Sequence, residues 1–327
     1  MSEKYTATFL LHALGDTIGF KNGEWEFNYY NRYADYRTTL DIVFDFISLG
    51  GITGIDLKNW RISDDTLFHL SIAESLLKIK LVNKLTDKQI EEIKEIMTDT
   101  LREIAKDEKV DIFRGVGITT FKSLAEEKTP FELAGGNGSA MRTLCIGLAY
   151  HKSSDLDKLI EYSIESSKIT HKNPIGYLGG LTTAYFTHLA INKIKLEEWP
   201  IKLIELVNSE KVSKYIDKDN FSVYSNYRLF ISLWNKYIEL RFKDNKPIYT
   251  NSHKNLIFRT KFFYDFKYNY DTFEKFTELL KIDINSVVNV PNTKNKFYKF
   301  VNFIYKIKSK FIFYKSFYNM KVSGDKL

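Results

Sequence analysis

The stretch WRISDDTLFHLSIAESLL, residues 60–77, decides the fold class. Ser63 is a preferred N-cap residue, and the acids Asp64 and Asp65 that follow it complement the positive end of a helix dipole. Capping alone therefore explains these three residues, and ligand binding is the alternative that the rest of the sequence must support. The apolar residues recur at spacings of three and four, the period of one helix face, at Leu67, Leu70, Ala73, Leu76 and Leu77.

The same helical period continues from the start of the chain to about residue 240. We find no regular alternation of strands with helices, which predicts an all-α fold with one dense helical core. Thr86, Asp87 and Pro174 are typical of helix starts, and Gly19 and Gly50 of helix ends. The predicted helices are 5–19, 41–49, 64–81, 87–106, 116–125, 139–150, 155–167, 174–191, 200–208 and 227–240.

Composition limits the class of protein. The chain has 327 residues, of which 44% are hydrophobic, so it is long enough for one large domain or two small ones. Cys145 is the single cysteine, which excludes an internal disulfide and fits a reducing compartment. The apolar residues 6–18 include His12 and Asp16, and no run reaches the ~18 apolar residues of a membrane helix. We therefore expect a cytoplasmic protein that does not contact a membrane.

Residues 246–327 differ from the rest of the chain, because Lys, Phe and Tyr are interleaved there with few acids. Basic and aromatic residues together are typical of single-stranded nucleic-acid grooves. An AT-rich coding sequence produces the same composition, and a net charge of +7 is by itself a weak sign of nucleic-acid binding. We predict helices at 271–280 and 296–317 and assign no further structure to this segment.

Two loops carry acids or glycines at helix ends. In ALGDTIGFKNGEWEF, residues 13–27, Asp16 lies near the end of an apolar helix and Glu26 lies in the loop after it. In FRGVGITTFKSL, residues 113–124, Gly115 and Gly117 precede a predicted helix. Taken singly, each is equally well explained as an ordinary cap or turn.

Two further loops combine glycine or histidine with a helix start. AGGNGSAMRTLCIGL, residues 134–148, has three glycines before Ser139, which can cap the helix that follows. Backbone N–H groups at such a start bind anions, phosphate above all. SKITHKNPIGYLGG, residues 167–180, places His171 just before Pro174, although a single loop histidine is more often inert.

These loops occur in one order and spacing, and together they resemble the ADP-ribosylglycohydrolase family, most closely the ADP-ribosylarginine hydrolases. The resemblance covers residues 5–241 and is carried by GDTIGFKNGEWEF, WRISDDTLFHLSIAESLL, GGNGSAMRTLCIGL and SIESSKITHKNPIGYLGGLTTAYFTHLAIN. It implies a compact orthogonal helical domain over residues 1–245, followed by a divergent segment, 246–327.

The resemblance also implies a reaction and its residues. Members hydrolyse the N-glycosidic bond between ADP-ribose and a modified arginine, usually over two Mg²⁺ ions. The matching metal ligands are Ser63, Asp64 and Asp65, and the matching catalytic acids are Asp64, Asp65 and Glu26. The matching ADP-ribose-binding positions are Gly115, Gly117, Asn137, Gly138, Ser139, Met141 and His171. The expected partner is an ADP-ribosylated protein or ADP-ribose, and the expected state is a monomer.

One family motif is not found in the sequence. The second metal motif is a Gly-Gly-Asp-(Ser/Thr)-Asp-(Ser/Thr) run near the C-terminus, and only Asp271-Thr272 and Gly324-Asp325 resemble part of it. Three hypotheses follow: an ADP-ribosylarginine hydrolase, a relative that binds ADP-ribose without cleaving it, or a protein that acts through its basic segment on nucleic acid or a partner.

Overall fold

The computed structural model describes residues 2–27, 42, 45–46, 48–50, 54–81, 83–107, 113–243 and 246–247. The chain divides into two units, one made of residues 1–32 and 57–248 and the other of residues 33–56 and 249–327. The first unit contains every candidate site residue. In the second unit, residues 42, 45–46 and 48 are helical and Gly50 follows in a turn.

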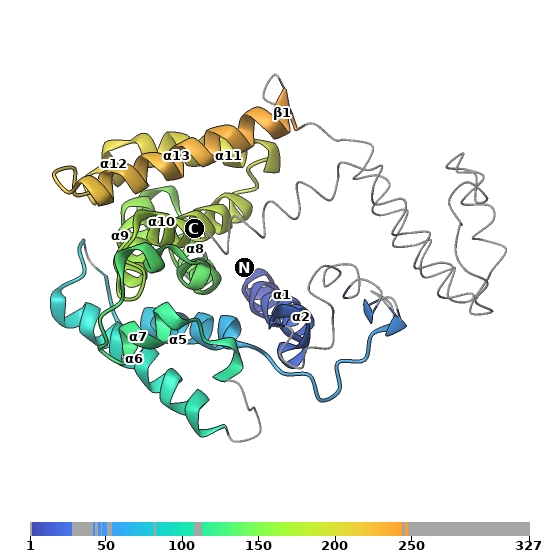
Figure 1. Cartoon of the computed structure of the whole chain (residues 1–327). Coiled ribbons are helices and arrows are strands. Elements are labelled where there is room, and N and C mark those ends of the chain that lie inside the picture. Colours follow the sequence, from blue (N-terminus) through green and yellow to red (C-terminus); the bar gives the residue numbers. More distant parts are fainter. Residues whose placement is uncertain are drawn as a thin grey trace, which may run out of the picture. The chain divides into compact units, whose positions relative to one another are not determined.

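The described part of the chain is almost entirely helical, which confirms the all-α prediction (Figure 1). Its α-helices are α1 Ser2–Phe20, α2 Glu24–Phe27, α5 Asp64–Lys78, α6 Asp87–Lys106, α7 Ile118–Leu124, α8 Leu144–Ala149, α9 Leu156–Lys168, α10 Pro174–Ile191, α11 Trp199–Asn208, α12 Glu210–Ser213 and α13 Phe221–Arg241. Short 3₁₀ helices are η1 Lys21–Gly23, η2 Phe113–Gly115, η3 Phe131–Gly135, η4 Asn137–Arg142, η5 Ser153–Asp155 and η6 Leu196–Glu198. A two-residue strand, β1 Phe242–Lys243, pairs antiparallel with β2 Lys246–Pro247.

Helix α10 is the centre of the first unit and packs against α8, α9, α13 and η4 (Figure 1). Asn173 caps its start by accepting the Ile175 amide at 3.0 Å, and Pro174 occupies its first turn. Apolar residues lie on every side of this helix, which is the pattern of a fully buried helix. The α8 backbone approaches it so closely that a Cβ at Gly147 would lie 2.2 Å from the Ala184 carbonyl oxygen.

Helix α6 covers α5 with one apolar stripe. Thr86 and Gln89 form a capping box at its start, which fixes where the helix begins. Spacings of three and four then place its buried residues on one face, and these are Ile93, Ile96, Met97, Leu101 and Ile104. The predicted bounds 87–106 are therefore confirmed, as are 174–191 for α10.

Several predicted bounds are wrong. The helix predicted at 139–150 is instead the 3₁₀ helix η4 followed by α8. Helix α1 does not stop at Gly19, because the chain reverses where Lys21 and Asn22 take positive φ angles of 41° and 55°. Helix α13 begins six residues before the predicted 227, where the Asn220 side chain caps it.

The helices predicted at 271–280 and 296–317 lie outside the described residues. Within the predicted helix 41–49, the described residues 42, 45–46 and 48 are helical and Leu49 lies in a turn. The domain boundary at 245 also stays a prediction. No helix in the described ranges is long and apolar enough to cross a membrane.

Candidate functional site

The start of α5 is capped twice. The Ser63 hydroxyl accepts the Asp65 amide at 3.1 Å, so the capping interpretation of this stretch is confirmed. Asp16 then reaches over from α1, and its Oδ2 accepts the amides of Ser63 at 3.0 Å and Thr66 at 3.2 Å. The same oxygen accepts the Thr66 hydroxyl at 2.5 Å. Helix α1 therefore supplies an acceptor for the amides of the α5 terminus that have none within the helix.

Asp64 lies in a group of carboxylates that raise one another's pKa. Burial raises the pKa of Asp64 to about 8, with further contributions from Asp65, Glu26 and Asp16. Burial, followed by the charge of Asp16, raises the pKa of Asp65 to about 6. Within the described residues, Asp16, Asp64 and Asp65 form no ion pair with Lys or Arg. A bound cation would offset this repulsion.

The chemistry of these side chains fits part of a magnesium site. Carboxylate and hydroxyl oxygens are the hard donors that Mg²⁺ prefers, and Ser63, Asp64 and Asp65 supply them at consecutive positions. The described ranges contain no group of three or more His, Cys, Asp and Glu side chains already arranged around a metal position. The fit therefore rests on the donor type and the unbalanced charge.

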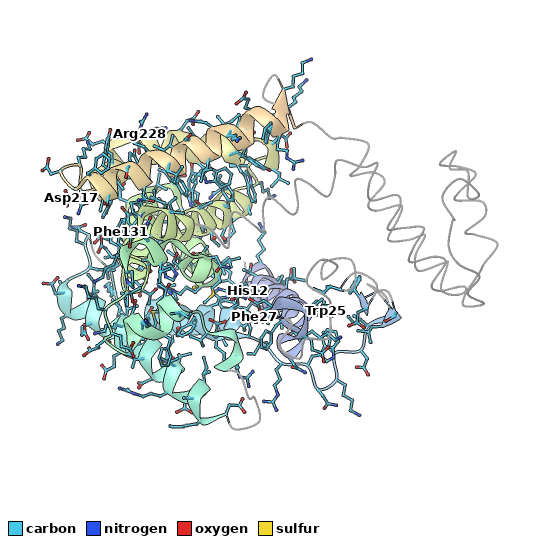
Figure 2. All side chains as sticks on the ribbon, in the orientation of Figure 1. His12, Trp25, Phe27, Phe131, Asp217 and Arg228 are labelled. Carbon is cyan, nitrogen blue, oxygen red and sulfur yellow. The ribbon has the colours of Figure 1, made fainter. Side chains whose placement is uncertain are left out.

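Glu26 is placed near these acids by the turn between α1 and α2. The Lys21 ammonium lies 4.8 Å from the ring centroid of Trp25 and 5.8 Å from that of Trp60. The Asn22 side chain also accepts the Arg61 amide at 3.0 Å. This turn is therefore fixed to the segment that leads into α5, and Figure 2 labels Trp25 on α2, just after the turn.

Gly115 lies against Asp64, as the site assignment expects. Asp107 pairs with both Arg61 and Arg114, which ties η2 to the residues before α5. Gly115 has a φ of +84°, and a Cβ there would lie 2.8 Å from the Phe27 ring and 3.5 Å from Asp64 Oδ1. Only glycine adopts this positive φ and this close approach to Phe27 without strain.

A second group of candidate residues surrounds the glycine-rich turn before η4. His171 packs on Gly138, where a Cβ would lie 2.8 Å from His171 Cε1 and 3.0 Å from Thr120 Oγ1. The Ser139 hydroxyl donates to the Gly176 carbonyl at 2.6 Å, so the expectation that Ser139 caps a helix is wrong. This hydrogen bond instead ties the turn to α10.

The remaining candidates differ in their surroundings. Asn137 is exposed at the start of η4. The Met141 carbonyl lies 3.0 Å from His12 Nε2, a contact with α1, on which Figure 2 labels His12. Gly117 begins α7 with nothing within 4 Å of its Cβ position, so the structure does not bring it against the other candidates.

Sequence reasoning missed Arg142, which lies between the two groups. Its side chain is fully buried, and its Nη1 donates to the Gly138 carbonyl at 3.0 Å. Its charge also interacts with that of Asp64. The one signal in the sequence is an arginine within the apolar run that follows the glycine-rich turn, because a charge in a buried segment requires specific partners. Sequence motifs likewise give Asp16 no role in the site, although its carboxylate caps α5 beside Asp64.

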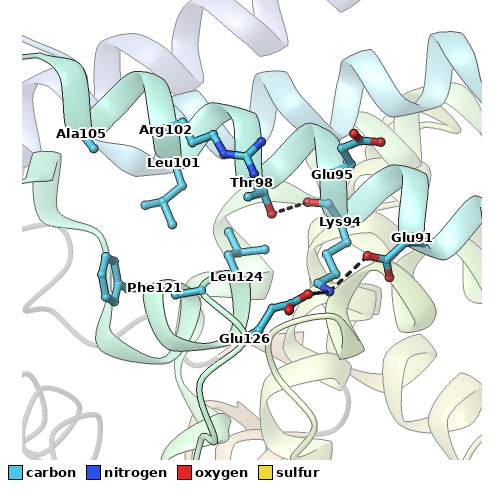
Figure 3. Close-up of a pocket in the computed structure, with 11 residues that line it drawn as sticks. Glu91, Lys94, Glu95, Thr98, Leu101, Arg102, Ala105, Phe121, Leu124 and Glu126 are labelled. Carbon is cyan, nitrogen blue, oxygen red and sulfur yellow. Dashed lines mark hydrogen bonds and ion pairs between the residues drawn. The ribbon is translucent and has the colours of Figure 1, made fainter.

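A separate cavity of about 740 Å³ lies between α6 and α7 (Figure 3). Leu101 and Leu124 line it. Lys94 pairs with Glu91 on the same helix at 3.1 Å and with Glu126, just after α7, at 2.8 Å. None of the candidate site residues lines this cavity, so it is separate from the candidate functional site.

Comparison with known proteins connects the two groups of residues to one family. The ADP-ribosylglycohydrolase family model matches residues 1–239. The mimivirus protein named "Putative ADP-ribosyl glycohydrolase L444" is 34% identical over 247 residues, which are 72% of this chain and 47% of that protein. ADP-ribosylhydrolase ARH1 of Dictyostelium discoideum is 31% identical over 268 residues, 75% of this chain and 64% of that protein. ADP-ribosylhydrolase ARH3 of Mus musculus is 30% identical over 150 residues, 42% of this chain and 36% of that protein.

The chain thus spans about half of the first of these relatives and just under two thirds of the second. The family match covers more than half of the chain and includes every candidate residue from Glu26 to His171. This protein belongs to the ADP-ribosylglycohydrolase family.

Proposed function

We propose that this chain is an ADP-ribosyl glycohydrolase that removes ADP-ribose from modified protein arginine. The observation that carries the proposal is the buried Asp64, which lies near the carboxylates of Asp65, Glu26 and Asp16. In the described residues, Asp64 forms no ion pair with Lys or Arg. Groups of buried, mutually repelling carboxylates are typical of functional sites, where a bound cation offsets the repulsion. Membership of the ADP-ribosylglycohydrolase family supports hydrolysis of a glycosidic bond to ADP-ribose as the reaction at this site.

Ser63, Asp64 and Asp65 are the residues that would hold Mg²⁺ in this proposal. When bound, the ion would supply positive charge that holds the ribose hydroxyls and orients a water molecule. The family's second acidic motif does not occur in the 327 residues, so the proposal assigns ligands from the α5 terminus alone.

The chain's own groups perform the remaining tasks. The carboxylates of Glu26, Asp64 and Asp65 are the bases available to take a proton from the attacking water as the ribose carbon gains positive charge. The backbone amides of residues 136–139, beside His171, are the groups proposed to hold the diphosphate and the adjoining ribose. Gly115 allows the η2 turn to lie against the Phe27 ring and Asp64, because it has no side chain.

A second candidate function is ADP-ribose binding without cleavage. It is favoured by the missing second acidic motif, because removing one preorganised charge-stabilising group typically lowers a rate by ~10²–10³-fold. Recognition depends instead on the glycine-rich turn, which the sequence retains. The proposed partner in either case is an ADP-ribosylated protein in the cytoplasm, bound by a monomer.

The deciding experiment uses the full chain with saturating Mg²⁺ and a peptide that carries ADP-ribose on arginine. Release of ADP-ribose is measured by chromatography, and binding of free ADP-ribose by calorimetry. Asp64→Ala is the test variant. Asp99→Ala is its matched control, since Asp99 is an exposed aspartate on α6 that pairs only with Arg102 in the described residues.

Release that is lost in Asp64→Ala and kept in Asp99→Ala supports the hydrolase. Binding without release supports the second candidate function. Absence of both binding and release overturns both functions. The same peptide with ADP-ribose on serine tests the arginine preference, because an O-glycosidic bond then replaces the N-glycosidic bond.

A further inference from the structure

The buried guanidinium of Arg142 donates hydrogen bonds in several directions. Nη1 donates to the Gly138 carbonyl at 3.0 Å, and Nη2 donates to the Ser166 carbonyl at 3.0 Å and to Thr170 Oγ1 at 2.9 Å. Burial lowers the pKa of Arg142 to about 9, so the side chain remains a cation at neutral pH. In the described residues no carboxylate lies within ion-pair distance of it. Carbonyl and hydroxyl oxygens therefore take the place of water around this charge.

The hydroxyl of Thr170 lies between Arg142 and His171. Its oxygen is 2.9 Å from Arg142 Nη2 and 2.8 Å from His171 Nδ1. Arginine can only donate, so this oxygen must accept from Nη2. The hydroxyl hydrogen then needs an acceptor, because Thr170 is only 1% exposed and its Oγ1 makes no other hydrogen bond in the described ranges. Among the described residues, Nδ1 of His171 is the one acceptor in reach.

This arrangement determines which ring nitrogen of His171 carries the proton. Burial and the charge of Arg142 lower the pKa of His171 to about 3, so the ring is neutral at pH 7. A neutral imidazole carries a single N–H. If that N–H were at Nδ1, the Thr170 hydroxyl hydrogen would be buried without a partner. The proton therefore belongs on Nε2.

The Nε2 edge of His171 faces the glycine-rich turn. A Cβ at Gly138 would lie 3.1 Å from Nε2, and a Cβ at Gly136 would lie 3.6 Å from it. Nε2 makes no hydrogen bond to any described residue. The turn thus leaves a neutral N–H donor beside the amides that the proposed function assigns to ADP-ribose.

We propose that Arg142 and Thr170 are positioning residues that hold His171 in its Nε2–H form, as a neutral donor for an oxygen of the bound ligand. The identity of that ligand rests on the proposed function, whereas the protonation site of His171 does not. Arg142 acts in two ways: it orients the Thr170 hydroxyl, and its Gly138 contact fixes the turn that His171 faces.

The test is nitrogen NMR of the histidine rings in the full-length protein without ligand at pH 7. The His171 signals are identified by their loss in His171→Asn. We expect the wild type to show a protonated Nε2 and an unprotonated, hydrogen-bonded Nδ1. Thr170→Val removes the hydroxyl at nearly constant volume and should convert His171 to a mixture of the two forms, whereas Thr170→Ser should restore the wild-type form.

Thr182→Val is the matched control, because the buried Thr182 hydroxyl donates only within α10, to the Leu178 carbonyl at 2.7 Å. It should leave the His171 signals unchanged. Calorimetry with free ADP-ribose then measures the consequence. We expect Thr170→Val to weaken binding about five- to tenfold, and we expect Thr170→Ser and Thr182→Val to change it less than twofold.

A wild-type His171 protonated on Nδ1 overturns the inference. It is also overturned if Thr170→Val keeps both the Nε2–H signal and the wild-type affinity. A wild type that shows the Nε2–H form but binds no ADP-ribose overturns the proposed function and supports the positioning inference, because the NMR measurement needs no ligand.

Discussion

Asp16 Oδ2 and Thr66 Oγ1 lie 2.5 Å apart, and this contact joins the end of α1 to the first turn of α5. The Asp16 carboxylate complements the helix terminus and its dipole, which stabilises the fold. It also adds negative charge beside Asp64 and Asp65 and raises the pKa of both. Asp16 therefore stabilises the position of the α5 terminus and also increases the repulsion that a bound cation would offset.

We predict that Asp16→Ala lowers the free energy of unfolding by about 2 kcal/mol, the range measured for hydrogen bonds to charged groups. The Ser63 and Thr66 amides lose their shared acceptor in this variant. Asp16→Asn should cost less, because it keeps an acceptor and relieves the repulsion on Asp64. Urea denaturation measures both changes. Asp87→Ala, at the exposed start of α6, is the control, and an equal loss there would assign the effect to general helix-end charge.

We predict opposite results for alanine at two neighbouring glycines. Gly115→Ala should lower the free energy of unfolding by about 1–2 kcal/mol, because φ is +84° and the new Cβ meets the Phe27 ring. Gly117→Ala should be neutral or slightly stabilising, because φ is −65° and the space around it is open. Thermal unfolding of the pair compares them directly. Equal midpoints would show that the η2 turn relaxes.

Much of the fold could be predicted from periodicity, because α6 and α10 carry strong end signals at Thr86 and Pro174. The bounds 87–106 and 174–191 are confirmed for that reason. The failure at 139–150 has a physical cause. Ser139 donates to the Gly176 carbonyl, a partner 37 residues away that no local pattern identifies.

The candidate site could be predicted only in part. Short motifs identified Ser63, Asp64 and His171 through their resemblance to a family. Asp16, Arg142 and Thr170 act through hydrogen bonds across the fold, so their neighbours in the sequence give no sign of their partners. A side chain whose role depends on a distant helix requires a structure to be recognised.

The buried His69, which lies beside His12, predicts that the free energy of unfolding falls at acid pH. His69 stacks on Phe9 with ring centroids 4.6 Å apart, and its Nε2 has no hydrogen-bond partner among the residues that the structure describes. Burial, followed by the charge of His12, lowers the pKa of His69 to about 3. Between pH 6.5 and 3 the unfolded chain therefore binds a proton that the folded chain does not, and stability falls as the pH falls.

His69→Phe removes this proton uptake and keeps an aromatic ring on Phe9. We expect the variant to lose less stability than the wild type when the pH falls from 7 to 5, by about 1–2 kcal/mol at about 1.4 kcal/mol per pH unit. Urea denaturation at both pH values measures the difference. Parallel losses in the two proteins would mean that other groups account for the acid sensitivity.

The last prediction concerns Asp64, whose raised pKa gives its replacement two effects of opposite sign. Without a cation, the unfolded chain releases the Asp64 proton above pH 4, whereas the folded chain retains it until about pH 8. Folding is therefore disfavoured increasingly as the pH rises through this range. Asp64→Asn has no such proton, so at pH 7 without Mg²⁺ it should be about 1–3 kcal/mol more stable than the wild type.

Mg²⁺ should remove most or all of this difference, because the proposed site loses an anionic ligand in the variant. A ligand at 100 times its Kd stabilises the folded state by about 2.7 kcal/mol, and the wild type should gain this amount while Asp64→Asn gains little. Thermal unfolding with and without Mg²⁺, with Asp99→Asn as the control, measures both effects. Equal Mg²⁺ stabilisation of all three proteins would assign Ser63, Asp64 and Asp65 to capping alone, since the cation would then bind elsewhere or not at all.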